Sequence, residues 1–224
     1  MAHMDWTAFA LSLRLSACTV VILLVLGLLV ARSLAWREFK GKHLLEAVVA
    51  LPLVLPPTVL GYYLLVFFGR ESVLGSALES LTGQSLVFSF SGLVLASVIY
   101  SFPFAVQPML RAFEAIPHSL REAAWCSGLT HWQTFRRIEL PLARSGIISA
   151  LALSFAHTMG EFGVVLMVGG NIPGETRTLS IAIYDRVQAF DEASAGVMSL
   201  LLLIFAFVTV SLVYVFTRQP PRHR

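Results

Sequence analysis

The sequence predicts an all-α integral membrane protein with about five transmembrane helices. Only 13% of its 224 residues are charged, whereas about a quarter of the residues in a soluble domain carry charge. Hydrophobic residues make up 57% of the chain, and they form long blocks separated by charged joints. A helix that crosses a bilayer needs about 20 mostly apolar residues. A soluble helical bundle would instead leave whole apolar helices exposed to water.

Five apolar blocks are long enough to cross a hydrocarbon core of about 30 Å at a rise of about 1.5 Å per residue. These blocks cover residues 8–31, 44–68, 86–109, 143–168 and 194–217. No linker or internal repeat divides them, so we expect one transmembrane domain over residues 5–218. Residues 1–3 precede a second methionine and are typical of a cloning remnant.

The basic residues of the joints predict how the chain is oriented in the membrane. Three basic residues lie in the joints after the second and fourth blocks, and twelve lie in the other joints and the C-terminal tail. The twelve are Arg32, Arg37, Lys40, Lys42, Arg111, Arg121, Arg136, Arg137, Arg144, Arg218, Arg222 and Arg224. Because cytoplasmic joints are enriched in Lys and Arg, we expect the N-terminus outside and the C-terminus in the cytoplasm.

Prolines interrupt two of the blocks. The second block contains Pro52, Pro56 and Pro57. Proline bends or ends a helix because it lacks an N–H and clashes with the preceding turn. Two interpretations stay open: a kink that neighbouring helices absorb, or a break at Pro56 and Pro57 that lines a translocation path. In the third block, Pro103 and Pro108 lie near the cytoplasmic end and suit a helix that bends toward the joint.

Ionisable residues are rare within membrane spans and are therefore functional candidates. Arg14 lies in the first block, and His157 and Glu161 lie in the fourth. Arg14 and Glu161 have similar depths, so a buried ion pair is the favoured interpretation, with Glu161 at an outer gate as the alternative. His157 is better interpreted as a packed residue than as a proton relay. Ser154 and Thr158 share a helical face with Glu161; they line the pore or bond to their own helix.

The joint after the third block contains the signals of two short helices. Ser119 followed by Glu122 is an S-x-x-E capping box, and Thr130 followed by Gln133 is a second box of the same kind. Gly128 lies between them and suits a left-handed helix end. The joint is therefore expected to form a helix, a sharp turn and a second helix.

The same joint carries a longer spaced pattern: Glu-Ala-Ala, three residues, Gly, nine residues and Ile-x-Leu-Pro. The matching residues are Glu122, Ala123, Ala124, Gly128, Ile138, Leu140 and Pro141. The second short helix is expected to end near Ile138, before Pro141 opens the fourth span. The pattern resembles the cytoplasmic loop of permease subunits of binding-protein-dependent ABC importers. By this resemblance, residues 111–141 form a coupling loop, and Ser119 joins the seven residues as part of its contact with an ATPase.

Three further stretches resemble the molybdate branch of these permeases. They are "LPLVLPPTVLGYYLL" at 51–65, "GEFG" at 160–163 and "NIPGETRT" at 171–178. Sulfate permeases share the loop and a Glu-aromatic-Gly element in the fourth span, so sulfate or another oxyanion is the alternative substrate. The resemblance implies molybdate, with tungstate as a second substrate.

The resemblance also implies an assembly. The chain would adopt the fold of type I ABC importer permeases and line the pore as a homodimer in the lipid of a bacterial inner membrane. Two cytoplasmic ATPase subunits would bind ATP-Mg, and an oxyanion-binding protein would dock on the outer side. Candidate docking residues lie in the joint after the fourth block: Asn171, Pro173, Gly174 and Arg177.

Several other functions are disfavoured by the residues themselves. No G-x-x-x-x-G-K-[ST] loop occurs, because the Gly41-Lys42 pair is followed by His43. We therefore expect a non-catalytic subunit without a cofactor or metal of its own. The basic residues lie at span ends, which favours a role in orientation over nucleic-acid binding. A gradient-driven secondary transporter is the alternative from another class, but the spans contain few ionisable residues.

Overall fold

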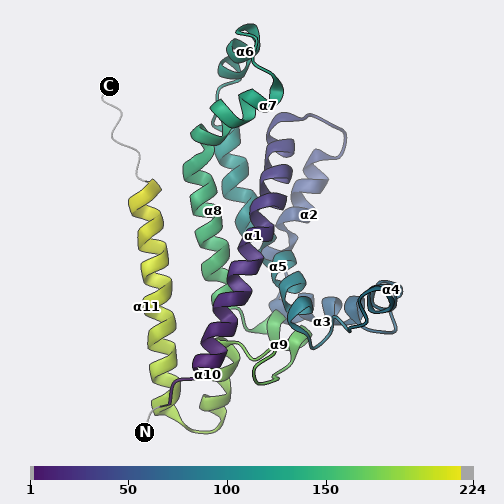
Figure 1. Cartoon of the computed structure of the whole chain (residues 1–224), viewed down its shortest axis with the longest axis vertical. Helices are drawn as coiled ribbons and strands as arrows, with labels where there is room; N and C mark the ends of the chain where they lie inside the picture. The colour runs from purple at the N-terminus through teal and green to yellow at the C-terminus, as the bar shows by residue number, and fades with distance from the viewer. Residues whose placement is uncertain (1–2, 218–224) are drawn as a thin grey trace.

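The computed structural model describes residues 3–217, and every regular element among them is a helix (Figure 1). In chain order the elements are α1 Trp6–Trp36, α2 Lys42–Val54, α3 Pro57–Phe68, α4 Val73–Thr82, α5 Phe90–Glu114, α6 His118–Cys126, α7 His131–Thr134, the π-helix Phe135–Glu139, α8 Leu140–Gly160, α9 Gly163–Gly169, α10 Leu179–Gln188 and α11 Glu192–Thr217. The tail arginines Arg218, Arg222 and Arg224, and the first two residues of the expected remnant, lie outside the described residues.

Long helices form the body of the molecule. Four described helices are long and apolar enough to cross a membrane, and a bent pair raises the number to five. The four are Trp6–Trp36, Phe90–Glu114, His131–Gly160 and Glu192–Val215. They confirm the predicted first, third and fifth spans, and the fourth differs in its bounds. The third span starts at Phe90 because the Ser89 hydroxyl caps it by accepting a hydrogen bond from the Gly92 N–H at 3.2 Å.

The second block is a broken helix, as the second interpretation of its prolines requires, and a role of the break in lining a translocation path stays a prediction. Helices α2 and α3 meet at 110°. Pro57 is the first residue of α3, where its missing N–H has no helical partner to lose. Pro52 stays inside α2. In α5, Pro103 and Pro108 are also tolerated, and the helix continues past both to Glu114.

The fourth block is broken too, a feature that the sequence analysis missed. Helix α8 ends at Gly160, Glu161 is extended, and the short α9 follows. The two breaks lie against each other, because a Cβ added to Gly163 would lie 2.8 Å from the Cβ of Pro57. A Cβ on Gly61 of α3 would likewise lie 2.8 Å from Met167 of α9. Small residues thus let α3 and α9 pack closely.

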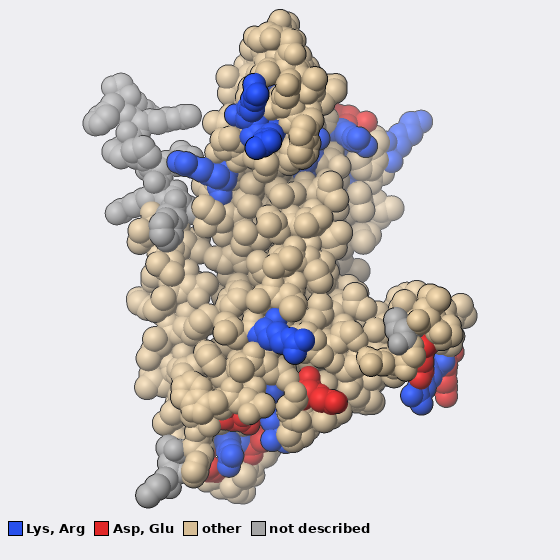
Figure 2. All heavy atoms as spheres, in the orientation of Figure 1, with Lys and Arg blue, Asp and Glu red and all other residues tan. Residues whose placement is uncertain are grey.

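The core lies between α1, α5 and α8, which run side by side (Figure 1). Its fully buried side chains include Leu34 of α1 and Met109 and Phe113 of α5. Helix α11 stands at the edge of the bundle, and only 6% of its apolar window is buried within the chain. Basic side chains gather at the end that carries α6 and α7 (Figure 2), and exposed apolar side chains cover the spans between the two ends.

The close contact of α5 with α8 gives a first test. We expect Gly146→Val to lower the free energy of unfolding by about 1–3 kcal/mol, because its Cβ would collide with Ala112 and lie 2.7 Å from the Pro108 carbonyl oxygen. Gly160→Ala is the control, since its Cβ meets nothing within 4 Å. Thermal unfolding in detergent measures both variants. Equal stability of the two would contradict the packing described.

Candidate functional site

The joint between α5 and α8 forms the outermost tip of the basic end (Figure 1). Helix α6 begins at His118, with Pro117 as its N-cap and without a side-chain capping bond. The predicted Ser119–Glu122 capping box is therefore wrong: Ser119 lies inside the first turn, because the helix starts two residues earlier than the box requires. Glu122 and Ala123 are exposed, whereas Ala124 is buried.

The turn after α6 forms as the sequence predicts. Gly128 has a φ of +80°, its N–H donates to the Trp125 carbonyl at 2.9 Å, and the Leu129 N–H donates to the Ala124 carbonyl at 3.0 Å. This pair of bonds is the Schellman motif, which satisfies the last carbonyls of a helix and favours glycine. Its left-handed backbone sends the chain sharply back toward the bundle.

The second capping box is confirmed. The Gln133 N–H donates to the Thr130 hydroxyl at 3.3 Å, and the Thr130 N–H donates to the Gln133 side chain at 2.9 Å. The helix that follows does not end near Ile138, as was expected. It passes through the π-helix into α8, so that His131–Gly160 is one continuous helix. The π-turn leaves room for Pro141, which cannot donate to the preceding turn.

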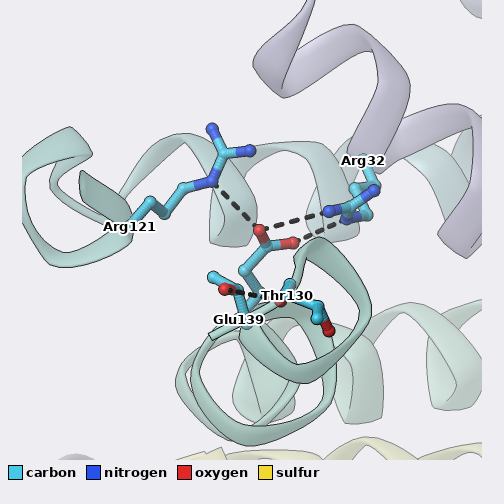
Figure 3. A network of polar contacts seen from close by, with 5 residues as sticks. Arg32, Arg121, Thr130 and Glu139 are labelled. Atoms are coloured by element: carbon cyan, nitrogen blue, oxygen red, sulfur yellow. Dashed lines mark hydrogen bonds and ion pairs between the residues drawn. The ribbon is translucent and has the colours of Figure 1, made fainter. Parts of the chain in front are cut away.

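Glu139 is the central side chain of this region (Figure 3). It is fully buried at the end of the π-helix. Its carboxylate accepts a hydrogen bond from Arg32 Nε at 2.6 Å and from Arg121 Nε at 3.0 Å. Arg32 Nη2 adds a longer bond of 3.3 Å. One buried carboxylate thus joins three elements: the end of α1, helix α6 and the start of the α8 span.

Aromatic rings cover both arginines. The guanidinium carbon of Arg121 lies 4.0 Å from the centre of the Trp36 ring and 5.0 Å from that of Trp125. The guanidinium carbon of Arg32 lies 4.9 Å from the centre of the Phe135 ring. Cations over aromatic faces are attracted by the ring quadrupole, and the rings also exclude water. The ion pairs therefore act in a setting where charges interact more strongly than at an open surface.

The sequence analysis missed Glu139 because it occupies the unspecified position of Ile-x-Leu-Pro. A signal was present, since an acid flanked by apolar Ile138 and Leu140 at the start of a span needs a buried partner. Five arginines occur in the same joint, so Arg121 could be identified as a partner of Glu139 only from the path of α6. The choice of Arg32 required the packing of α1 against α8.

The candidate path residues on α8 are buried inside the chain, and Thr158 contacts α5. Ser154 and Thr158 are buried, and the Thr158 hydroxyl lies 2.9 Å from the Ser101 hydroxyl. The Ser101 hydroxyl also lies 3.0 Å from Nδ1 of His157, whose ring stacks on Phe104 at 3.9 Å between centroids. These contacts agree with the interpretation of His157 as a packed residue, and they join α8 to α5 by polar groups.

Glu161 and Arg14 do not form the expected ion pair among the described residues. The Glu161 carboxylate instead accepts a hydrogen bond from the Val164 N–H at 2.9 Å and caps α9. The guanidinium carbon of Arg14 lies 4.6 Å from the centre of the Phe90 ring. Equal depth in the sequence did not bring the pair together, because the fourth block breaks at Glu161 and turns its side chain along the new helix axis.

The docking candidates belong to an ordered loop at the opposite end of the molecule. The Asn171 amide donates to both carboxylate oxygens of Asp185 in α10, at 2.9 and 2.8 Å, and Arg177 Nε donates to the Asn171 side chain at 2.6 Å. Pro173 and Gly174 are exposed at the tip, where Gly174 has a φ of +79°. Asn171 and Arg177 therefore shape the loop, and Pro173 and Gly174 form its open surface.

The helical fold and the loop formed by α6 and α7 define a class of protein, the membrane-spanning permease subunits of type I ABC importers. Within the described residues, no group of three or more His, Cys, Asp and Glu side chains is placed to hold a metal. The family described as "Binding-protein-dependent transport system inner membrane component" matches residues 23–222. The chain belongs to this family and is a multi-pass inner-membrane protein.

Individual relatives and one solved structure agree with this assignment. The chain is 47% identical to the molybdenum transport system permease protein ModB of Azotobacter vinelandii, over 96% of this chain and 95% of that protein. It is 40% identical to the ModB protein of Escherichia coli (strain K12), over 93% and 90% of the two chains. A bacterial ABC transporter that imports the acidic polysaccharide alginate has a similar fold, with a TM-score of 0.78 at 20% identity, covering 97% of this chain and 80% of that chain.

Breaking the buried ion cluster gives a second test. We expect Glu139→Ala to lower the free energy of unfolding by about 3 kcal/mol, because it leaves two arginines beside an apolar site. Exposed Glu122→Ala should change it by less than about 0.5 kcal/mol. In a double-mutant cycle with Arg121→Ala, the two losses should not add, since each change removes the same contact. Additive losses in thermal unfolding would show that the two residues act independently.

Proposed function

We propose that this chain forms the translocation pore of an ATP-driven importer for molybdate. Two copies would enclose the pore, and tungstate would be a second substrate. The support for molybdate is the high identity to permeases named for molybdenum transport over almost the whole of both chains. The capped loop at the basic end is the observation that supports coupling of transport to ATP hydrolysis, because it offers a partner subunit a rigid contact outside the bundle.

The α6–α7 loop, residues 118–134, is suited to bind a cytoplasmic ATPase subunit. Its open face carries Glu122 and Ala123 together with the partly exposed apolar side chains Leu120, Trp125 and Trp132. Aromatic side chains such as these two tryptophans are enriched at the centre of protein interfaces, and charged residues such as Glu122 belong to the rim. ATP-Mg would be bound by the ATPase, and this chain would contribute the loop that follows the movement of that subunit.

The Glu139 cluster is the means by which a movement of α6 would reach the membrane. Arg121 moves with α6, Arg32 with α1, and Glu139 with α8. A displacement of the loop that preserved these bonds would shift α1 and α8 together as one unit. The relative movement would then fall elsewhere, and the hinge-like breaks between α2 and α3 and between α8 and α9 are suited to absorb it.

The pore would lie along the broken helices. Pro56 is exposed where α2 ends, and Pro57 packs on Gly163 where α9 begins. Irregular backbone at membrane depth is tolerated where it lines a cavity or is covered by protein. In the dimer, this region would form the gate, with Glu161 holding α9 in place. Thr158 would support the path through its hydrogen bond to Ser101 of α5, and the buried Ser154 hydroxyl lies on the same face of α8.

The docking loop would receive an oxyanion-binding protein from the outer side. Its tip, Pro173 and Gly174, is exposed, and the Asn171–Arg177–Asp185 contacts hold it in shape. A preformed loop loses little conformational entropy on binding. Selectivity among tetrahedral dianions would then belong mainly to the binding protein.

Loss of the Gly128 turn should release the ATPase. We expect Gly128→Pro to abolish co-purification and uptake, because proline cannot adopt a φ of +80° and removes the N–H that bonds to Trp125. Gly83→Pro is the matched control at the end of α4, where Gly83 has a φ of +71° and its N–H donates to Glu79 at 2.8 Å. A Gly128→Pro variant that still bound the ATPase and transported normally would contradict the proposed coupling.

The substrate can be settled with the reconstituted complex of permease, ATPase and binding protein. We expect molybdate and tungstate to stimulate ATP hydrolysis and sulfate to leave it near the basal rate. Stimulation by sulfate alone would replace molybdate with the alternative oxyanion. Uptake that required a proton or sodium gradient and not ATP would reject the ABC importer altogether.

A further inference from the structure

Arg14, which has no role in the proposed transport mechanism, lines a groove beside the docking loop, and Gly174 at the tip of that loop forms part of the groove wall. The groove measures about 840 Å³ and lies between the first turns of α1, the start of α5 and the loop before α10. Its lining includes Trp6, Arg14, Ser89, Ser91 and Glu175. It lies at the end of the molecule opposite the α6–α7 loop, where basic and acidic side chains are interspersed (Figure 2).

The guanidinium group of Arg14 is positioned but not neutralised. The side chain is exposed, and its guanidinium carbon stacks over Phe90 at 4.6 Å. Among the described residues, no carboxylate lies within ion-pair distance of it, because Glu161 caps α9 instead. Stacking on a ring occupies one face of the planar group and leaves its N–H edge free to donate. This edge can bind a carboxylate or phosphate through two hydrogen bonds.

The depth of Arg14 in the bilayer restricts which anion can reach it. Arg14 is eight residues from the start of α1, which is about 12 Å along the axis. Its neighbours on the exposed side of the helix are apolar, with Leu13 40% and Val21 65% exposed. An arginine at this depth extends its side chain toward the interface. Phospholipid phosphates lie at this interface, so they are the anions that the extended Arg14 side chain can reach.

Glu175 adds a second charge of opposite sign to the same groove. A purely anionic headgroup would be repelled by this carboxylate, whereas a zwitterionic headgroup offers a partner to each residue. Its phosphate would bind Arg14, and its ammonium group would bind Glu175. The hydroxyls of Ser89 and Ser91, which lie 3.0 Å apart at the start of α5, are further hydrogen-bonding groups on the wall.

We propose that this groove is a binding site for a phospholipid with a phosphoethanolamine headgroup. The phosphate is held by Arg14 over Phe90, the ammonium by Glu175, and the acyl chains follow the exposed apolar side of α1. Trp6 is 65% exposed and lines the same groove, and tryptophan is enriched at membrane–water interfaces. The bound lipid would fix the outer end of α1 beside the loop that carries Gly174.

Native mass spectrometry of the detergent-solubilised permease, with added phosphatidylethanolamine or phosphatidylglycerol, tests the site. We expect the chain to bind the ethanolamine lipid more tightly than the glycerol lipid. Arg14→Gln should weaken binding of the ethanolamine lipid about tenfold, the loss expected from one charge-assisted contact. Glu175→Gln should abolish the preference between the two lipids while keeping phosphate binding.

Controls separate this site from general effects. Arg37→Gln removes the same charge from the exposed other end of α1 and should leave lipid binding unchanged. Arg14 has no described ion pair to lose, so Arg14→Gln should keep the unfolding temperature in lipid-free detergent. Inorganic phosphate and molybdate, added separately, should not displace the lipid.

Three outcomes would overturn the proposal. Equal lipid binding by Arg14→Gln and the unaltered chain would show that Arg14 binds no headgroup. Displacement of the lipid by free molybdate or phosphate would assign the groove to a soluble oxyanion. Loss of the dimer in the Arg14→Gln spectrum, with lipid binding intact, would assign it to a contact between two copies of the chain.

Discussion

The buried carboxylate of Glu139 makes the interaction on which the half of the molecule that carries α6 and α7 depends. A charge removed from water is tolerated only when other charges and hydrogen bonds replace its hydration. Arg32 and Arg121 provide both, so α1 and α6 are held to the start of the α8 span. The rings of Trp36 and Phe135 pack against the two guanidinium groups, while the Glu139 side chain itself is fully buried. A loop that would otherwise be flexible thereby becomes part of the bundle.

The other half of the molecule is built from broken helices. Two spans break at similar positions along the bundle, and their second halves, α3 and α9, pack on each other through glycine. The loop at one end is therefore joined to the bundle by charge at Glu139, whereas α3 and α9 in the opposite half are held together by close backbone contacts. Short segments joined by breaks can shift relative to one another without unwinding. This difference suits a transporter that receives a movement at one end and opens a passage at the other.

Hydrophobic blocks and turn signals predicted the spans, the Gly128 turn and the Thr130–Gln133 cap, because these features depend on local sequence. The break at Glu161 was missed, since the "GEFG" stretch contains no proline and its cause is the packing of Gly163 on Pro57. The Glu139 contacts span 18 and 107 residues, a separation that no local pattern reports. The expected Arg14–Glu161 pair failed for the same reason: depth along two helices does not specify which faces meet.

The π-turn between α7 and α8 has a consequence for how this family can vary. One extra residue per turn rotates all that precedes it by about 100° relative to an ordinary helix. The single extra residue at Phe135–Glu139 therefore sets the angle between the loop that carries Glu122 and the helix face on which Ser154 and Thr158 are buried. Deletion of one amino acid there would let the helix continue with ordinary α-helical hydrogen bonds, apart from the one that Pro141 cannot donate, and would aim the loop in another direction. The direction in which this loop faces a binding partner can therefore change through a single deletion, without any change in the residues of the loop or of the partner.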